Sequence, residues 1–211
     1  MNNRIEIPYA IPEDEKQVIR DNFASHTDWD KSVFDRIKAH IIRHLRQQQE
    51  NECCYCKRQL GFDIKEVDIE HIIPKSKYER FTFEPKNLAL SCPGCNTKKG
   101  DRNVLRSKVT NYPRTGSNLT IIHAHYDLYS DHIEILNQVI YIPKTDKGCE
   151  TIKLCELYRL KTVEDNMKAF LSQQDEIKKI VEQLRSTETK SGTLVRLLAQ
   201  LRRILKRNPM Q

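Results

Sequence analysis

Two Cys-x-x-Cys pairs constrain this chain more than any other feature. The first pair is Cys53 and Cys56, the second is Cys92 and Cys95, and 35 residues separate them. Four thiolates complete the tetrahedral coordination of Zn²⁺ and leave no position open for a substrate. The spacing therefore predicts a structural zinc site that ties together the two ends of residues 57–91.

The N-terminus and the lack of long apolar runs predict the cellular compartment, which in turn guides the interpretation of the other cysteines. The N-terminal segment has no apolar signal-peptide region, and the sequence has no apolar run of membrane-spanning length. We therefore expect a cytoplasmic protein, in which disulfides are rare. A redox function of the pairs is disfavoured because there are two of them and no βαβ pattern. Cys54, Cys149 and Cys155 are interpreted as small buried apolar residues.

The charge of the chain predicts an anionic partner. The net charge is +7, and residues 98–114 carry six basic residues and one acidic residue directly after the second cysteine pair. Clustered basic side chains give salt-sensitive affinity for a phosphate backbone. The alternative for any one of these side chains is a solvated surface position.

Changes in hydrophobic periodicity divide the chain into four segments. Helical spacing dominates the two ends, whereas short alternating runs and turn residues dominate the middle. The predicted domains are a helical N-terminal arm (1–50), a core with the cysteine pairs (51–110), a β-hairpin extension (111–160) and a C-terminal helical region (161–211).

Short elements are expected around the cysteines. Alternation predicts strands at residues 67–70 and 88–90, and residues 95–105 have room for a helix. Residues 133–135 and 139–142 predict the two strands of the hairpin. The fold class is thus α+β.

An acidic residue followed by histidine, Glu70-His71, ends the first predicted strand. Hydrolysis of a phosphodiester needs a base for water and a cation for the developing charge, and this pair offers a base and a carboxylate ligand. Taken alone the pair is weak evidence, because most such pairs are surface residues.

The surrounding residues change that interpretation. The order Cys-x-x-Cys, Glu70-His71-Ile72-x-Pro74, Asn87-Leu88 and Cys-x-x-Cys-Asn-x-x-Lys-Gly resembles the zinc-knuckle HNH (ββα-metal) endonucleases over residues 53–100. The resemblance implies that His71 is the general base and that Asn87 orients it through its side-chain amide. It also implies that Glu70, in a position usually held by aspartate, and Asn96 bind the catalytic metal. Asp68 is a possible alternate ligand.

The implied catalytic site has oxygen ligands. One carboxylate and one amide, completed by water and phosphate, suit Mg²⁺ or Mn²⁺. Three basic residues on or near the predicted helix would then face the nucleic acid: Lys98, Lys99 and Arg102. The resemblance favours DNA as substrate and leaves RNA open.

The layout outside the motif more loosely resembles PtuB, the HNH subunit of Septu-type anti-phage systems, which also occurs beside some retrons. That resemblance implies a defence nuclease controlled by an ATPase partner of the PtuA kind, since the chain itself has no P-loop. Two alternatives remain open at this point. One is a stand-alone restriction or homing nuclease, and the other is a non-catalytic zinc-knuckle protein that binds nucleic acid.

A second group of possible ligands lies outside the motif. His123 and His125 would share one face of a strand, with Asp127 nearby. No fourth ligand is evident, so a packed or surface strand is the preferred interpretation and a metal site the alternative.

Overall fold

The computed structural model describes residues 4–63, 65–136 and 140–159, and single positions between 172 and 200. The chain divides into two compact units, of which the first comprises Met1–Leu136 and Tyr141–Arg159. Every element described below lies in this first unit, apart from Ile140 at the start of β4. The helices predicted for residues 161–211 and the turn at residues 137–139 lie outside the described residues.

Two helices and two short 3₁₀ turns form the N-terminal part. Helix α1 (Glu13–Asn22) starts after Pro12 and carries three acidic residues in its first turn, where they interact favourably with the helix dipole. The turns η1 (His26–Asp30) and η2 (Ser32–Phe34) lead into α2 (Asp35–Gln48). Ile37, Ile41 and Leu45 recur every four residues and bury one face of α2. The predicted helical arm is confirmed here.

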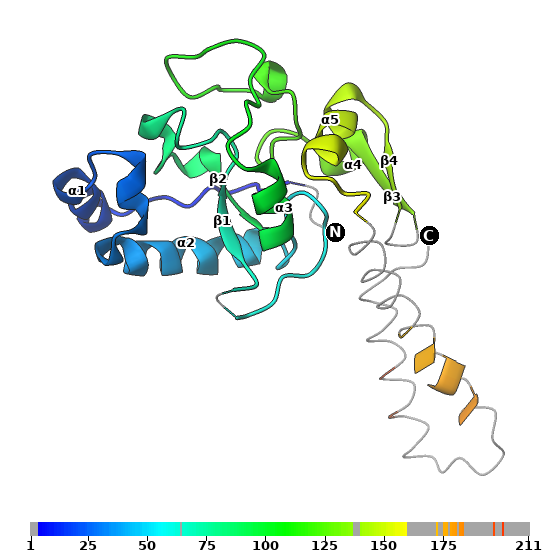
Figure 1. Ribbon diagram of the computed structural model, residues 1–211. Helices are drawn as coiled ribbons and strands as arrows, with labels where there is room; N and C mark the ends of the chain where they lie inside the picture. Colours follow the sequence, from blue (N-terminus) through cyan, green and yellow to red (C-terminus); the bar gives the residue numbers. More distant parts are fainter. Residues whose placement is uncertain are drawn as a thin grey trace. The chain divides into compact units, whose positions relative to one another are not determined.

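Two antiparallel strands and a helix form the centre of the unit. Strand β1 (Asp68–His71) pairs with β2 (Leu88–Ser91), so that His71 lies opposite Leu88 and Asp68 opposite Ser91. Between them lie the 3₁₀ turns η3 (Glu79–Phe81) and η4 (Pro85–Asn87). Helix α3 (Pro93–Lys99) follows β2 and contacts β1 (Figure 1). Both strands are confirmed within a residue or two of prediction, whereas the helix ends earlier than the predicted Leu105, because Gly100 has a positive φ of 54°.

The remaining elements follow a long irregular stretch. It contains η5 (Gly116–Asn118) and precedes α4 (Tyr129–His132), β3 (Ile133–Leu136), β4 (Ile140–Pro143) and α5 (Asp146–Leu154). Strands β3 and β4 form a separate two-stranded sheet, which confirms the predicted hairpin. The fold class is α+β, with a ββα centre and four cysteines positioned to bind a metal.

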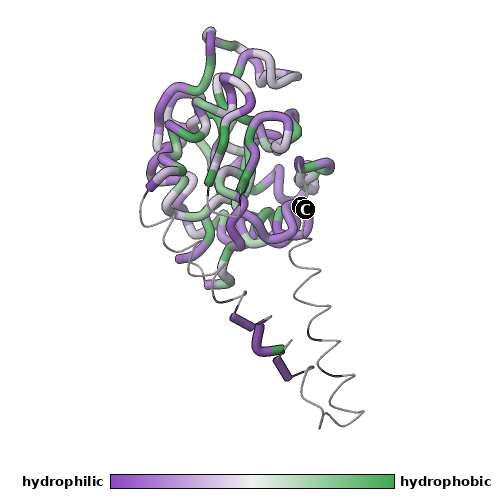
Figure 2. The backbone as a smooth tube through the Cα atoms, turned by 90° about the vertical axis from the view of Figure 1, so that its right-hand side faces the viewer, coloured by the Kyte–Doolittle hydropathy of each residue, from purple (hydrophilic) through white to green (hydrophobic). Residues whose placement is uncertain are grey.

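One hydrophobic core runs through the unit. Apolar segments gather in its interior in the hydropathy-coloured trace (Figure 2), and Phe34, Ile41, Leu45, Ile72 and Leu90 are completely buried. In the part of the chain that the structure describes, we find no helix with the length and apolar character that a bilayer crossing requires.

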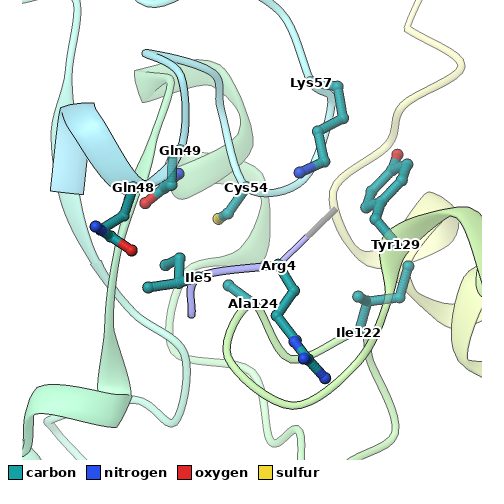
Figure 3. Close-up of a pocket in the computed structure, with 9 residues that line it drawn as sticks. All are labelled: Arg4, Ile5, Gln48, Gln49, Cys54, Lys57, Ile122, Ala124 and Tyr129. Carbon is teal, nitrogen blue, oxygen red and sulfur yellow. The ribbon is translucent and has the colours of Figure 1, made fainter. Parts of the chain in front are cut away.

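The N-terminal segment closes one side of this core. The backbone N–H of Ile5 donates to Ala124 O at 2.8 Å, and both residues line a small cavity together with Cys54 and Tyr129 (Figure 3). The cavity measures about 10 Å³, which is room for a single water molecule. It is therefore a packing feature and not a ligand site.

Candidate active site

The four paired cysteines meet at one point. Their sulfur atoms all lie within 4.8 Å of one another, all four side chains are buried, and Cys56 Sγ lies 3.8 Å from Cys92 Sγ. A Zn–S bond of about 2.3 Å in a tetrahedron implies sulfur atoms roughly 3.8 Å apart. The geometry thus fits one tetrahedral metal ion, and zinc suits a set of four thiolates.

Local backbone structure places these sulfur atoms. Lys57 has a positive φ of 56°, and its N–H donates to Cys53 O, which closes the first knuckle. Cys92 precedes α3 as its N-cap, and its carbonyl accepts hydrogen bonds from the N–H groups of Cys95 and Asn96. The second knuckle is therefore the first turn of the helix that carries Asn96.

His71 ends β1 and is almost completely buried. Its Nε2 lies 3.1 Å from the carbonyl oxygen of Thr82, and Trp29 contacts the ring edge-on, with ring centres 4.6 Å apart. A carbonyl oxygen only accepts, so Nε2 carries the proton and Nδ1 of the neutral ring is left as an acceptor. Nδ1 has no hydrogen-bond partner within the described ranges, yet it keeps some exposed surface.

The charge state of His71 follows from its surroundings. The pKa of His71 is lowered to about 3, mainly by burial and also by the charges of Lys75 and Lys99, while the hydrogen bond to the Thr82 carbonyl opposes the shift. The ring is therefore neutral at neutral pH, and its Nδ1 can accept a proton.

Asn87 holds the loop that supplies the Thr82 carbonyl. Its Oδ1 accepts from Ile73 N at 2.7 Å, and its Nδ2 donates to Ile73 O at 3.0 Å and to Phe81 O at 2.9 Å. The Asn87 amide contacts the backbone two residues after His71 and one residue before Thr82, and not the imidazole ring itself. Its effect on His71 is therefore transmitted through the loop.

Glu70 lies on the opposite face of β1 from His71, and it is 1% exposed. Its Oε1 lies 2.5 Å from Lys99 Nζ and accepts from the Tyr55 hydroxyl at 3.1 Å. Its Oε2 is buried and has no partner in the described part of the chain. Burial raises the pKa of Glu70, and Lys99 counteracts that shift.

Asn96 extends from α3 toward β1. Its Nδ2 donates to Asp68 Oδ2 at 2.9 Å, and both side chains are half-buried. With the amide nitrogen held by Asp68, the amide oxygen is the atom left for a cation. The unpartnered Oε2 of Glu70 and the amide oxygen of Asn96 are hard oxygen donors of the kind that Mg²⁺ or Mn²⁺ takes. Glu70 is buried, however, and faces away from His71, so sharing a cation beside His71 would require its carboxylate to leave Lys99.

The three predicted phosphate contacts differ in exposure. Arg102 is exposed, and Lys98 is half-buried in an ion pair with Glu156 at 2.7 Å. Lys99 is 1% exposed, and its ammonium also donates to His71 O at 2.8 Å. The predicted phosphate contact of Lys99 is therefore wrong, because its charge is used inside the protein.

The possible second metal group uses three of its four ring nitrogens in hydrogen bonds, and the fourth, His125 Nδ1, is buried without a partner among the described residues. His123 Nε2 lies 2.8 Å from the Tyr112 hydroxyl, and His125 Nε2 lies 2.8 Å from Leu88 O. Asp127 pairs with Lys147. Within the described residues, the four cysteines form the group of potential ligands that is close enough to hold a metal.

Comparison with known proteins agrees with this geometry. Residues 53–102 match the model of the HNH endonuclease family. These residues form an HNH domain. They contain both cysteine pairs, both strands, His71 and α3, so the described ββα centre coincides with the matched segment.

A curated relative extends the similarity beyond the HNH domain. The chain is 29% identical over 123 residues to the Septu protein PtuB of Bacillus thuringiensis. The aligned part covers 58% of this chain and 43% of the relative. The chain thus spans less than half the length of that protein.

Sequence reasoning missed several residues that shape the site. Thr82 acts through its backbone carbonyl, so its side-chain type carried no signal. Trp29 comes from η1, more than 40 residues before His71. Lys99 did carry a signal, since it lies three positions after Asn96 on a helix and must share the face that Asn96 turns toward β1.

Proposed function

We propose that this chain is a metal-dependent HNH endonuclease that hydrolyses phosphodiester bonds of DNA. The observation that supports it most is the fixed tautomer of His71. A buried imidazole with Nε2 held by Thr82 O and Nδ1 left as an acceptor is arranged to take a proton from water.

Each residue of the site has a distinct part in this proposal. Water attacks the phosphorus atom and passes its proton to His71 Nδ1, while the bond from phosphorus to the 3′ oxygen breaks. Glu70 and Asn96 would hold Mg²⁺ or Mn²⁺, with Asp68 orienting the Asn96 amide. The cation, when bound, stabilises the charge on the phosphate and on the leaving 3′ oxygen.

Lys99 acts as the counter-charge of Glu70 in the metal-free protein. A buried carboxylate is costly without a partner, and Lys99 Nζ lies 2.5 Å from it. The cysteine cluster, which we assign to zinc, fixes the start of α3 and therefore the position of Asn96.

The similarity to PtuB supports a role in bacterial anti-phage defence. We further propose that the chain acts in a complex in which an ATPase of the PtuA kind controls cleavage, which is what the resemblance of its sequence to PtuB implies. The exposed Arg102 would face the DNA backbone.

Cleavage of plasmid DNA tests the enzymatic part of the proposal. The chain, expressed with its genomic neighbours, is expected to cut in Mg²⁺ or Mn²⁺ and to stop in EDTA. His71→Ala should abolish cutting, whereas the control His132→Ala, in α4, should not. Equal cutting by His71→Ala and wild type would remove the catalytic assignment. A parallel incubation with tRNA distinguishes DNA from RNA as substrate.

Co-purification tests the defence assignment independently. Tagged chain, expressed from its native locus, should recover an ATPase subunit. If active nuclease is recovered alone, the chain is a stand-alone enzyme. Bound but uncut DNA with both wild type and His71→Ala would instead favour a non-catalytic zinc-knuckle protein.

A further inference from the structure

The His123-Ala124-His125 segment packs against the junction between η4 and β2. His125 Nε2 donates to Leu88 O at 2.8 Å, and His123 is completely buried and stacks on Tyr126, with ring centres 4.1 Å apart. Leu88 directly follows Asn87. The two histidines therefore pack beside Asn87, the residue whose side chain holds the loop between His71 and Thr82.

Hydrogen bonding fixes the tautomer of His123. Its Nδ1 accepts the backbone N–H of His125 at 3.1 Å, so Nδ1 carries no proton. Burial lowers the pKa of His123 well below its ordinary value, which keeps the ring neutral. The proton is then on Nε2, which donates to the Tyr112 oxygen at 2.8 Å.

The tautomer of His123 also sets the direction of the hydrogen bond that the Tyr112 hydroxyl makes. Since the Tyr112 oxygen accepts from His123, its own proton is free to be donated. This single proton lies between two acceptors, the nearer Lys86 O at 3.0 Å and Asn87 Oδ1 at 3.3 Å, so Tyr112 holds Asn87 through the carbonyl that precedes it as well as through its side chain. The Tyr112 ring also packs edge-on against Phe81, with ring centres 5.1 Å apart, and Phe81 O accepts from Asn87.

A continuous path therefore leads from His123 to the candidate base. It runs from His123 through Tyr112 to Asn87, from Asn87 to the backbone of Ile73 and Phe81, and from the next carbonyl, Thr82 O, to His71 Nε2. His123, Tyr112 and Asn87 each make hydrogen bonds to both of their neighbours on this path. Removing one of these side chains therefore leaves a buried polar group without a partner.

We propose that Tyr112 and His123 are positioning residues for His71. They hold Asn87 in place, and Asn87 holds the loop carbonyl that sets the tautomer and orientation of the His71 ring. The proposal rests on the proposed nuclease function, in which His71 is the base.

Tyr112→Phe tests the proposal because it removes only the hydroxyl and keeps the ring against Phe81. We expect kcat for oligonucleotide cleavage to fall about 10- to 100-fold with KM within about twofold of wild type, since a misplaced base slows chemistry without weakening binding. The matched control is Tyr126→Phe. Its hydroxyl donates to Pro113 O at 2.6 Å, away from Asn87, and kcat should not change. Equal losses in both variants, or no loss in either, would overturn the proposal.

A spectroscopic measurement separates this proposal from the nuclease function. In protein labelled with ¹⁵N at histidine, wild-type His71 should show a protonated Nε2 and an unprotonated Nδ1. Tyr112→Phe should show a second tautomer or exchange broadening. Unchanged His71 signals would overturn the positioning role, whether or not the wild type cleaves DNA. Absence of cleavage by the wild type would instead overturn the nuclease function alone.

His123 variants supply a rescue test that does not depend on Tyr112. His123→Gln keeps a side-chain N–H donor for the Tyr112 oxygen, whereas His123→Ala does not. We expect kcat of the Gln variant to lie near wild type and that of the Ala variant to match Tyr112→Phe. If both His123 variants lose kcat equally, hydrogen bonding to Tyr112 is not the cause, and the proposal fails.

Discussion

His71 Nε2 and Thr82 O are joined by a hydrogen bond of 3.1 Å although they lie 11 positions apart along the chain. The bond assigns the proton of the imidazole to Nε2 and leaves Nδ1 for chemistry. Its length depends on how the intervening loop is folded, and Asn87 determines that fold with its side-chain bonds to Ile73 and Phe81.

Replacing Asn87 should therefore affect both stability and cleavage. Asn87→Ala leaves the backbone N–H and C=O of Ile73 without partners and leaves Phe81 O with the N–H of Glu84 alone, and we expect a loss of about 3 kcal/mol in the free energy of unfolding. Urea denaturation measures it. Asn87→Asp keeps the acceptor for Ile73 N but sets a buried carboxylate oxygen, which cannot donate, against Ile73 O and Phe81 O, so at neutral pH it should lose at least as much stability as Asn87→Ala. Wild-type stability of either variant would contradict the assigned hydrogen bonds.

Removing one zinc ligand should lower the stability of the fold, and any loss of catalysis should follow from that. Cys92→Ser is expected to abolish stoichiometric zinc and to lower the melting temperature sharply, because metal binding contributes folding free energy. Elemental analysis and circular dichroism measure the two effects. Cys149→Ser is the control, since Cys149 lies outside the cluster and should keep one zinc per chain. A folded, zinc-free Cys92→Ser protein would refute the assignment.

The buried pair of Glu70 and Lys99 should show strong energetic coupling. Lys99→Met leaves an uncompensated buried carboxylate, so we expect a loss of about 3–5 kcal/mol in unfolding free energy. The double variant Glu70→Gln with Lys99→Met should be more stable than Lys99→Met alone. Lys98→Met removes a partly exposed pair with Glu156 and should change stability little. Additive losses in the double variant would show that the two charges do not interact.

The buried neutral histidines should make the fold sensitive to acid. Burial lowers the pKa of His125 to about 4, whereas an unfolded histidine titrates near its ordinary value of 6.5. Between these values the unfolded chain binds more protons, so stability is lost as pH falls below about 6.5. This residue alone should contribute a loss of roughly 2 kcal/mol between pH 7 and pH 5.

Urea denaturation of wild type and His125→Gln at both pH values isolates that contribution. The glutamine keeps a donor for Leu88 O and does not titrate, so its stability should fall less on acidification. Because zinc thiolates also respond to acid, the difference between the two proteins is the relevant quantity. An identical loss in both would show that His125 is not responsible.

Local patterns predicted the framework of the site well. The alternation around Val67–Glu70 and at Leu88–Leu90 indicated strands that the structure contains, and the acidic start after Pro12 indicated α1. The predicted hairpin is likewise present, although its turn lies outside the described residues. These features depend on neighbours in sequence, which is why periodicity detects them.

Contacts between residues that are distant in the sequence could not be predicted from such local patterns. Lys99 was predicted to contact phosphate, and although its helical spacing from Asn96 indicated the face it lies on, the pairing with Glu70 became evident only in the fold. His123 and His125 were possible metal ligands by type, and only packing showed their nitrogens directed to Tyr112 and Leu88.

The sequence by itself determined the cysteine cluster, the order of strands and helix, and the identity of the candidate base. The tertiary structure alone decided which nitrogen of His71 is available and which cation neutralises Glu70. The physical reason is that ligand spacing and side-chain alternation are properties of short segments, whereas a tautomer and a buried charge are set by atoms that folding brings from distant positions. Thr82 O, Lys99 Nζ and the Trp29 ring are those atoms here.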